Sequence, residues 1–523
     1  MSEKMPKARL RVRRLAQRRA NPHRPLFRVG ANTLSLRMLE EGMIILGDTG
    51  SGKTSTAIAL AIRVVCGAPH FGGGCFIATK PGDKDAYLSI LKKIGREHDV
   101  IVVGPDGPGI NLADYILHRP EGGGIRDMLV TLEQLAQVAQ RFRGAHSQGD
   151  IFWSVQGGEV HRHALELMQA ATGRWSIPLL AQIIREAPGP DTTAEQLADS
   201  VVSKHLYKAV TDPAIPLPEY DLLRIRSYFQ TTLGKMDHRT RSGVLASAML
   251  PLFELLSGPL HKAFSSTTEI VPDLAWTANR ILLIDWPIKT YGATGALASA
   301  IWKLLFMRAV EARCTRTYPN TVLLLNDECH LTMLGQGIEN DFQSTARSAR
   351  CVSCMATQNI NAIISSIDGA NAREAAFNWL GNLKNRFILS SSCPDTADYI
   401  GRMVGKSLQT RRSGGRNWGF VTNQGNSSGV SGSVTHSSSG SSYTTGHSWS
   451  SNRGFSTSAG GNAGWSQVVE DIIRPGTFGR NFRTGGPDNN FKVDGLLFRP
   501  SYRFRETGAN FTLFTMDQRK VLS

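Results

Sequence analysis

Short apolar runs alternate with helix-period stretches over residues 30–126 and again from residue 275. Runs of this length, bounded by Gly, Pro and Asp, are typical of buried strands, and the stretches between them have the 3.6-residue period of helices. Parallel strands covered by helices on both faces produce this pattern. We therefore predict an α/β fold whose buried strands include Met43–Leu46, Gly74–Thr79, Asp99–Gly104, a run ending at Asp285, Thr321–Leu325, Cys351–Thr357 and Asn385–Ser390.

Between Asp127 and Leu274 the strand-like runs disappear and helical periodicity dominates. Strand-like alternation returns only at Phe491–Asp517, around a turn at Gly508. The pattern divides the chain into a basic arm (1–29), the first part of the α/β domain (30–126), an all-α insertion (127–274), the second part of the α/β domain (275–412), a Ser/Gly-rich low-complexity loop (413–465) and a C-terminal β segment of the α/β domain (466–523).

Positive charge is concentrated in two parts of the chain. The net charge is +16, and residues 1–28 contain ten Lys or Arg but only one acid, Glu3. Residues 399–469 contain six Lys or Arg and no acid. Such focused charge favours an anionic polymer or surface as partner, with solubilising tails as the alternative. For the Ser/Gly-rich segment we keep two interpretations, a flexible loop and a DNA-contacting loop.

Cysteines and hydropathy point to a soluble protein of a reducing compartment. The seven cysteines are an odd number and lie mostly in apolar runs. Cys351 and Cys354 have C-x-x-C spacing, but without a second Cys or His pair they are better explained as buried thiols than as a zinc site. No apolar run free of charge reaches the length of a membrane-spanning helix, since Ala296–Phe306, for example, is interrupted by Lys303.

The strand Met43–Leu46 leads into a sequence that matches G-x-x-x-x-G-K-[ST], and a helix-period segment follows at once. Glycines let backbone N–H groups surround phosphate oxygens, and the helix N-terminus adds partial positive charge. Lys53 is expected to contact the β- and γ-phosphates and Thr54 to bind Mg²⁺. The predicted ATP-binding residues are Gly47, Asp48, Thr49, Gly50, Ser51, Gly52, Lys53, Thr54 and Ser55.

Hydrolysis requires carboxylates in addition to a phosphate-binding loop. Thr321–Leu325 leads through Asn326 into Asp327 and Glu328. We predict that Asp327 holds Mg²⁺ through water and that Glu328 is the general base.

Two further polar residues are candidates for catalysis. Gln358 follows the strand Cys351–Thr357, so it should lie beside Asp327 at the carboxyl edge of the sheet and contact the γ-phosphate or the attacking water. Arg347 precedes the same strand and is a candidate arginine finger for a neighbouring subunit. Spacing alone favours a surface helix arginine for Arg347, and Arg350 is the competing candidate for the finger.

These motifs, in this order, resemble the type IV secretion coupling proteins, the TraG/TraD-like conjugative DNA-transfer ATPases. The resemblance covers about residues 30–520. It is carried by the GDTGSGKT loop, Lys80-Pro81-Gly82-Asp83, Ile110-Asn111-Leu112, Ile151-Phe152-Trp153, LLIDWP, LLLNDE, ARSARCVSCMATQN and Thr396-Ala397-Asp398-Tyr399-Ile400.

The resemblance implies a RecA-like P-loop NTPase motor domain with an inserted all-α domain. It further implies a homo-hexameric ring that uses ATP and Mg²⁺ to pump DNA, usually bound to a relaxase, towards a secretion channel. In this family pattern Lys53 and Thr54 are the phosphate and Mg²⁺ ligands, and Asp327 and Glu328 form the Walker B pair. Gln358 is the sensor and Arg347 is the finger acting in trans.

The family usually has N-terminal transmembrane helices, and here we expect the basic arm in their place. The chain is then expected to be cytoplasmic, with a peripheral position at the inner membrane where it contacts the channel. Two alternatives stay open. One is a DNA pump of the FtsK/HerA type, and the other is a nucleotide-gated hub that recruits protein substrates without moving DNA.

Overall fold

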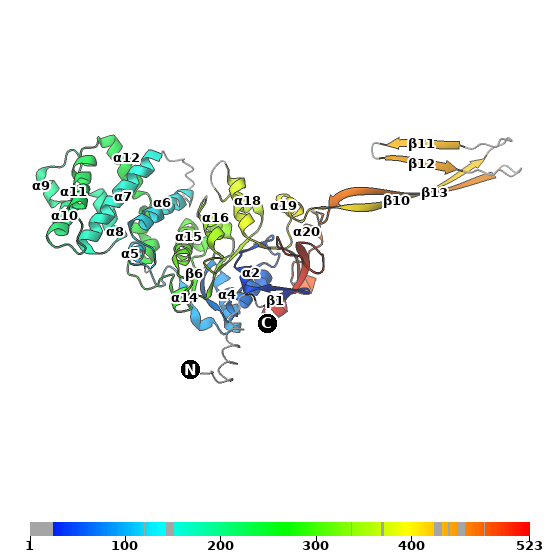
Figure 1. Ribbon diagram of the computed structural model, residues 1–523, viewed down its shortest axis with the longest axis horizontal. Coiled ribbons are helices and arrows are strands. Elements are labelled where there is room, and N and C mark those ends of the chain that lie inside the picture. Colours follow the sequence, from blue (N-terminus) through cyan, green and yellow to red (C-terminus); the bar gives the residue numbers. More distant parts are fainter. Residues whose placement is uncertain are drawn as a thin grey trace, which may run out of the picture. The chain divides into compact units, whose positions relative to one another are not determined.

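The computed structural model (Figure 1) describes residue 23 and residues 25–522, apart from 120, 143–150, 336, 368–370, 423–430, 438–439, 447–454 and 475. Most of the basic arm therefore lies outside the described residues. The chain divides into two compact units, Met1–Thr396 with Phe478–Ser523, and Ala397–Thr477.

The first unit is built on a nine-stranded sheet with the order β15-β14-β9-β3-β8-β7-β4-β6-β5. Every pairing from β9 to β5 is parallel, and β14 joins antiparallel to β9 and to β15. The strands are β3 (Met43–Leu46), β4 (Phe71–Ala78), β5 (Val100–Val103), β6 (Ile281–Asp285), β7 (Thr321–Asn326), β8 (Cys351–Thr357), β9 (Asn385–Ile388), β14 (Lys492–Phe498) and β15 (Phe511–Asp517).

The central strands are buried at every position, which explains their uninterrupted apolar sequences. All residues of β3, β7 and β8 are buried. Met43 and Ile45 pack into one cluster with α3 (Ala59–Cys66) and α4 (Asp83–Lys93), and the alternate residues Ile44 and Leu46 are equally buried. A sheet covered on both faces has this property, so the expected α/β fold with a parallel sheet is confirmed.

A hairpin and several short helices lie next to the sheet in the first unit; the other helices between β5 and β6 and the long helix α15 (Ile288–Ala312) are described below. A hairpin of β1 (Pro25–Val29) and β2 (Asn32–Ser35) precedes these elements, and Gly30 turns the chain between its strands with a φ of 58°. The remaining helices are α2 (Leu36–Leu39), α5 (Leu112–His118), α16 (Ile338–Thr345), α17 (Ile360–Ile364), α18 (Ala372–Asn382), α20 (Thr477–Arg480) and α21 (Gln518–Leu522).

Between β5 and β6 the described chain is helical, with no strand, as the periodicity indicates. Ser176 begins one helix by accepting a hydrogen bond from Leu179 N, and a proline occupies the first turn, where no donor is required. The helices are α6 (Ile125–Phe142), α7 (Ile151–Thr172), α8 (Ile177–Arg185), α9 (Ala194–Asp199), α10 (Val201–Thr211), α11 (Glu219–Ser227), α12 (His238–Met249), α13 (Gly258–Phe264) and α14 (Leu274–Thr277).

A long helix, α15 (Ile288–Ala312), follows β6. It is the one helix among the described residues that has the length and apolar composition to cross a membrane, and 83% of its most apolar window is buried inside the protein. Its apolar run is still interrupted by charge, as the sequence indicates. Lys303, which interrupts the apolar run, is itself buried and forms an ion pair of 2.9 Å with Glu339 of α16.

Replacing Lys303 with alanine should strongly destabilise the first unit. The Lys303 and Glu339 side chains are 1% and 4% exposed, so the mutation leaves a buried carboxylate without its counter-ion. Loss of one member of a buried pair costs roughly 3–5 kcal/mol, which denaturant unfolding would measure. Lys204→Ala, which removes an ion pair of 2.7 Å on the surface of the all-α insertion, is the control and should leave stability unchanged. Equal stabilities of the two variants would contradict the prediction.

The second unit contains α19 (Pro394–Val404) from Ala397 onward and two antiparallel ribbons (Figure 1). β10 (Lys406–Thr422) pairs in register with β13 (Phe455–Asp471), and β11 (Ser431–Ser437) pairs with β12 (Gly440–Gly446). The prediction of a loop at 413–465 is thus wrong for the described part of this segment. Extended Ser- and Gly-rich backbone pairs through its own N–H and C=O groups and needs no apolar periodicity to do so.

Both members of the C-x-x-C pair are buried on β8 and have free thiols. Burial raises the pKa of Cys351 to about 12 and also raises the pKa of Cys354. Nowhere in the described chain do three or more His, Cys, Asp or Glu gather as a metal site. The interpretation as buried thiols is confirmed.

Candidate active site

Four parallel strands end together at one edge of the sheet, and the candidate residues follow them. Leu46 of β3 is opposite Thr357 of β8, Met355 of β8 is opposite Asn326 of β7, and Asn326 is opposite Ile77 of β4. The phosphate-binding loop, Asp327 and Glu328, and Gln358 therefore meet at the carboxyl ends of adjacent strands. Ligands of open α/β sheets bind at this edge.

The loop between β3 and the helix η1 (Thr54–Ile58) has the backbone that the glycine pattern indicates. Gly50 and Gly52 have φ values of 81° and 85°, which favour glycine. Asp48 anchors the loop to the end of β9, because its carboxylate accepts hydrogen bonds of 2.6 Å from the backbone N–H and the hydroxyl of Ser392. Thr49 and Gly50 are exposed, whereas Ser51 is buried.

Lys53 lies against the carbonyl groups of its own loop. Its ammonium donates to the backbone oxygens of Gly47 at 2.6 Å and of Asp48 at 3.2 Å, and its side chain is buried. Burial lowers the pKa of Lys53, although the nearby carboxylates of Glu328 and Asp327 oppose this shift. The buried ammonium can exchange carbonyl contacts for phosphate oxygens when an anion enters the loop.

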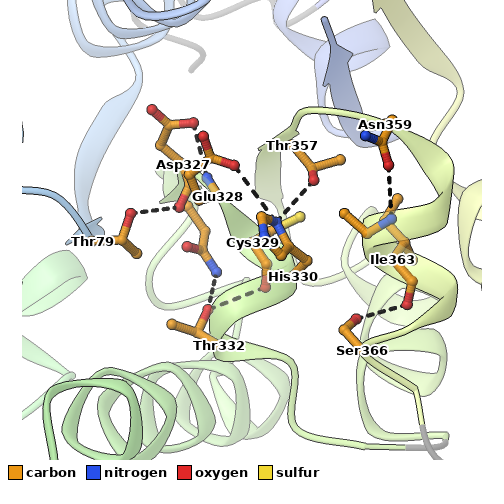
Figure 2. A network of polar contacts seen from close by, with 12 residues as sticks. Thr79, Asp327, Glu328, Cys329, His330, Thr332, Thr357, Asn359, Ile363 and Ser366 are labelled. Carbon is orange, nitrogen blue, oxygen red and sulfur yellow. Dashed lines mark hydrogen bonds and ion pairs between the residues drawn. The ribbon is translucent and has the colours of Figure 1, made fainter. Parts of the chain in front are cut away.

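The side-chain oxygens of Thr54 and Asp327, two potential metal ligands, lie next to each other. The Thr54 hydroxyl donates to Oδ2 of Asp327 at 3.3 Å, and Oδ1 of Asp327 accepts from the backbone N–H of Glu328 at 2.9 Å. Asp327 is fully buried, and Thr79 at the end of β4 donates to its carbonyl oxygen at 3.2 Å (Figure 2). A hydroxyl and a carboxylate suit Mg²⁺, which completes its coordination with water and substrate phosphates. The predicted metal residues are therefore together.

Glu328 is held in an unusual conformation directly after β7. Its φ is 47°, a left-handed conformation that is uncommon for residues other than glycine and costs free energy of folding. The side chain is 3% exposed, and its Oε1 accepts a hydrogen bond of 2.6 Å from Lys80. Burial acts to raise the pKa of Glu328, but the hydrogen bond and charge of Lys80, together with the charges of Lys53 and His330, outweigh it and lower the pKa. The carboxylate is thus ionised at neutral pH, as a base requires.

Gln358 and Arg347 lie at opposite ends of β8. Gln358 follows Thr357 at the carboxyl edge, as expected, between the strands that carry the phosphate-binding loop and Asp327. Arg347 lies before the strand, and its guanidinium pairs at 3.2 Å with Glu41, which precedes β3. The side chain of Arg347 is 53% exposed. Within one subunit Arg347 is thus at the other edge of the sheet from the phosphate-binding loop.

The structure adds contacts that the sequence did not indicate. Lys80, which follows β4, contacts Glu328 and lies 3.8 Å from Oδ2 of Asp327. His330 lies 3.6 Å from the second carboxylate oxygen of Glu328 and 3.0 Å from the Thr357 hydroxyl (Figure 2). From the other end of the chain, Gln518 donates to the Ser55 hydroxyl at 2.6 Å. The sequence shows that Lys80 follows an apolar run. Its contact with Glu328 was not predictable, because it depends on β4 and β7 being neighbours in the sheet.

Comparisons with known proteins agree with this architecture. Residues 321–457 match the family model described as "TraM recognition site of TraD and TraG". No curated protein matches the sequence.

Among solved structures, the unbound conjugative coupling protein TrwB is 12% identical, with a TM-score of 0.55 over 96% of this chain and 89% of that chain. TrwB in complex with ADP and Mg²⁺ is 13% identical, with a TM-score of 0.55 over 95% and 89%. These structures share the fold, an α/β domain with a helical insertion. The chain is thus similar to the TraD and TraG proteins over residues 321–457, from β7 onward, and it shares the overall fold of TrwB.

Proposed function

We propose that the chain is a ring-forming ATPase that hydrolyses ATP with Mg²⁺ and uses the energy to move DNA, or a DNA–protein complex, in conjugative transfer. The observation that carries this proposal is the meeting of the Lys53–Thr54 loop with Asp327 and Glu328 at one sheet edge. Mg²⁺ held there would neutralise charge that develops on the phosphates. Lys53 would bind the β- and γ-phosphates, and Glu328 would accept a proton from the attacking water.

The similar proteins support ATP as the nucleotide and a protein as the partner. One TrwB structure contains ADP and Mg²⁺, and another contains a non-hydrolysable ATP analogue. The matching family is that of the TraM recognition site of TraD and TraG. This supports a protein partner that is bound to the DNA substrate, such as a relaxase-containing complex. We propose that the ring is a homo-hexamer. It would be cytoplasmic, lie at the periphery of the inner membrane and contact a secretion channel.

The charge distribution supports DNA as the anionic partner. The arm of residues 1–28 contributes most of the net charge of +16, and residues 399–469 add six Lys or Arg without any acid. Lys and Arg that neutralise phosphates bind without reading sequence, and the affinity falls steeply as salt concentration rises. A polymer moved through a ring requires contacts of this kind.

ATP hydrolysis should require Mg²⁺ and should be stimulated by DNA. The test is the steady-state hydrolysis rate with and without double- and single-stranded DNA, measured from low to physiological salt. Lys53→Ala is the inactive control, because it removes the buried cation of the loop. Slow hydrolysis that DNA does not change would contradict a pump and favour a nucleotide-gated hub for protein substrates.

A DNA pump of the FtsK/HerA type would show the same stimulation. Transfer of a relaxase-bound strand in a mating assay separates the two. A coupling protein should support transfer, whereas a general DNA pump should not.

A further inference from the structure

His330 follows β7 and contacts Thr357, the last residue of the neighbouring strand β8. Its Nδ1 lies 3.6 Å from Oε2 of Glu328 and 3.0 Å from Oγ1 of Thr357, so one ring nitrogen faces both side chains (Figure 2). The other carboxylate oxygen of Glu328, Oε1, accepts a hydrogen bond from Lys80. Within the described chain Oε2 of Glu328 is buried and accepts no hydrogen bond, and the His330 ring lies beside it.

His330 lies in the short helix η5 (Cys329–Thr332). Thr332 accepts a hydrogen bond of 2.7 Å from the Asn326 side chain, and Leu331 N donates to Glu328 O at 2.9 Å. These bonds close the turn that follows the Asp-Glu pair and carries His330. The His330 side chain is only 18% exposed, so its interactions are weakly screened by water.

Thr357 connects the imidazole to the nucleotide-binding elements. Its carbonyl oxygen accepts a hydrogen bond of 3.3 Å from Gly47 N, the first residue of the phosphate-binding loop. The next residue in the chain is Gln358. A shift of the β8 end would therefore move the loop, the Gln358 backbone and the hydroxyl that contacts His330 together.

We propose that His330 and Thr357 are positioning residues. They keep Oε2 of Glu328 at a fixed position relative to the end of β8, which Gln358 follows. With a hydrogen on Nδ1, the ring attracts both Oε2 and the Thr357 oxygen, while Lys80 holds Oε1. The base is then oriented from both sides, and its position depends on the state of the phosphate-binding loop. This inference rests on the proposed role of Glu328 in ATP hydrolysis.

The test compares His330→Ala, His330→Asn and His330→Gln in the full-length protein. Loss of orientation should lower kcat for ATP roughly 10- to 100-fold, with little change in KM, because a small misplacement of a reacting group is costly. The Asn amide lies near the position of Nδ1 and has two hydrogens, one for Glu328 and one for Thr357, so it should restore most of kcat. Gln, whose amide lies near the position of Nε2, should not.

Thr357→Val should lower kcat by a similar factor, and Thr357→Ser should restore it. The double variant with His330→Ala should be no slower than the slower single variant, since residues of one network do not act additively. His238→Ala, which removes an exposed histidine that pairs with Asp191, is the matched control and should hydrolyse ATP at the parental rate. Thermal unfolding and binding of a non-hydrolysable ATP analogue verify that each variant is folded.

Two results would overturn the inference: parental kcat for His330→Ala, or full additivity in the double variant. Glu328→Gln separates this failure from failure of the proposed function. If Glu328→Gln is inactive while His330→Ala is fully active, only the positioning role is wrong. If Glu328→Gln hydrolyses ATP at the parental rate, the assignment of the base is wrong as well.

Discussion

Glu328→Gln is expected to bind ATP and Mg²⁺ normally but to hydrolyse ATP roughly 10²- to 10⁴-fold more slowly, the range that a positioned general base contributes. The amide keeps the shape of the side chain and can still contact Lys80, but it cannot accept a proton from water. Nucleotide binding should survive because the Lys53 and Thr54 contacts of the loop are untouched. Single-turnover hydrolysis, together with a fluorescent ATP analogue for binding, measures the two effects separately.

A matched control for this variant is Glu195→Gln, which makes the same chemical change on the exposed surface of α9. It should leave both binding and hydrolysis at parental values. If Glu328→Gln loses nucleotide binding together with activity, the carboxylate supports the loop rather than the chemistry. A parental rate of hydrolysis would require another base.

Arg347→Ala should reduce ATP hydrolysis by roughly 10³- to 10⁵-fold in assembled protein, the range measured for arginine fingers supplied in trans. The physical reason is its position. Arg347 precedes β8 and pairs with Glu41, so within its own subunit it faces away from the loop that follows β3. Only a neighbouring subunit could place it at a phosphate.

Subunit mixing tests this role directly. Arg347→Ala subunits contribute an intact Glu328, and Glu328→Gln subunits contribute an intact Arg347. A mixed ring therefore contains some complete interfaces and should regain activity that neither variant has alone. No recovery at any ratio, in assemblies shown to exchange subunits, would contradict a finger in trans. Arg350→Ala is the comparison variant, because Arg350 is the competing candidate for the finger. Its guanidinium donates a hydrogen bond to the Pro319 carbonyl of its own chain.

Several expectations from the sequence hold because they depend on local chemistry. The apolar run Met43–Leu46 is a strand, the glycines after it take left-handed φ values, and a helix follows. The stretch after β5 is helical because its apolar residues recur with the helical period. Asp327 lies at the end of a strand because the run of apolar residues ends there.

Other features were not predictable because short-range patterns carry no information on them. Ser- and Gly-rich strands such as β11 are stabilised by backbone pairing with β12, which leaves no apolar period. Lys303 interrupts an apolar helix in the sequence, yet it is buried because Glu339 of a different helix neutralises it.

The sequence by itself determined the nucleotide loop around Lys53, the acidic pair Asp327 and Glu328, and the division into a sheet and a helical insertion. Each of these is encoded by residues that are neighbours in the chain. The tertiary structure alone decided that β7 lies between β4 and β8. That order places Lys80 on one oxygen of Glu328 and His330, with Thr357, at the other. The groups that surround the base are distant in sequence, and only the pairing of strands brings them together.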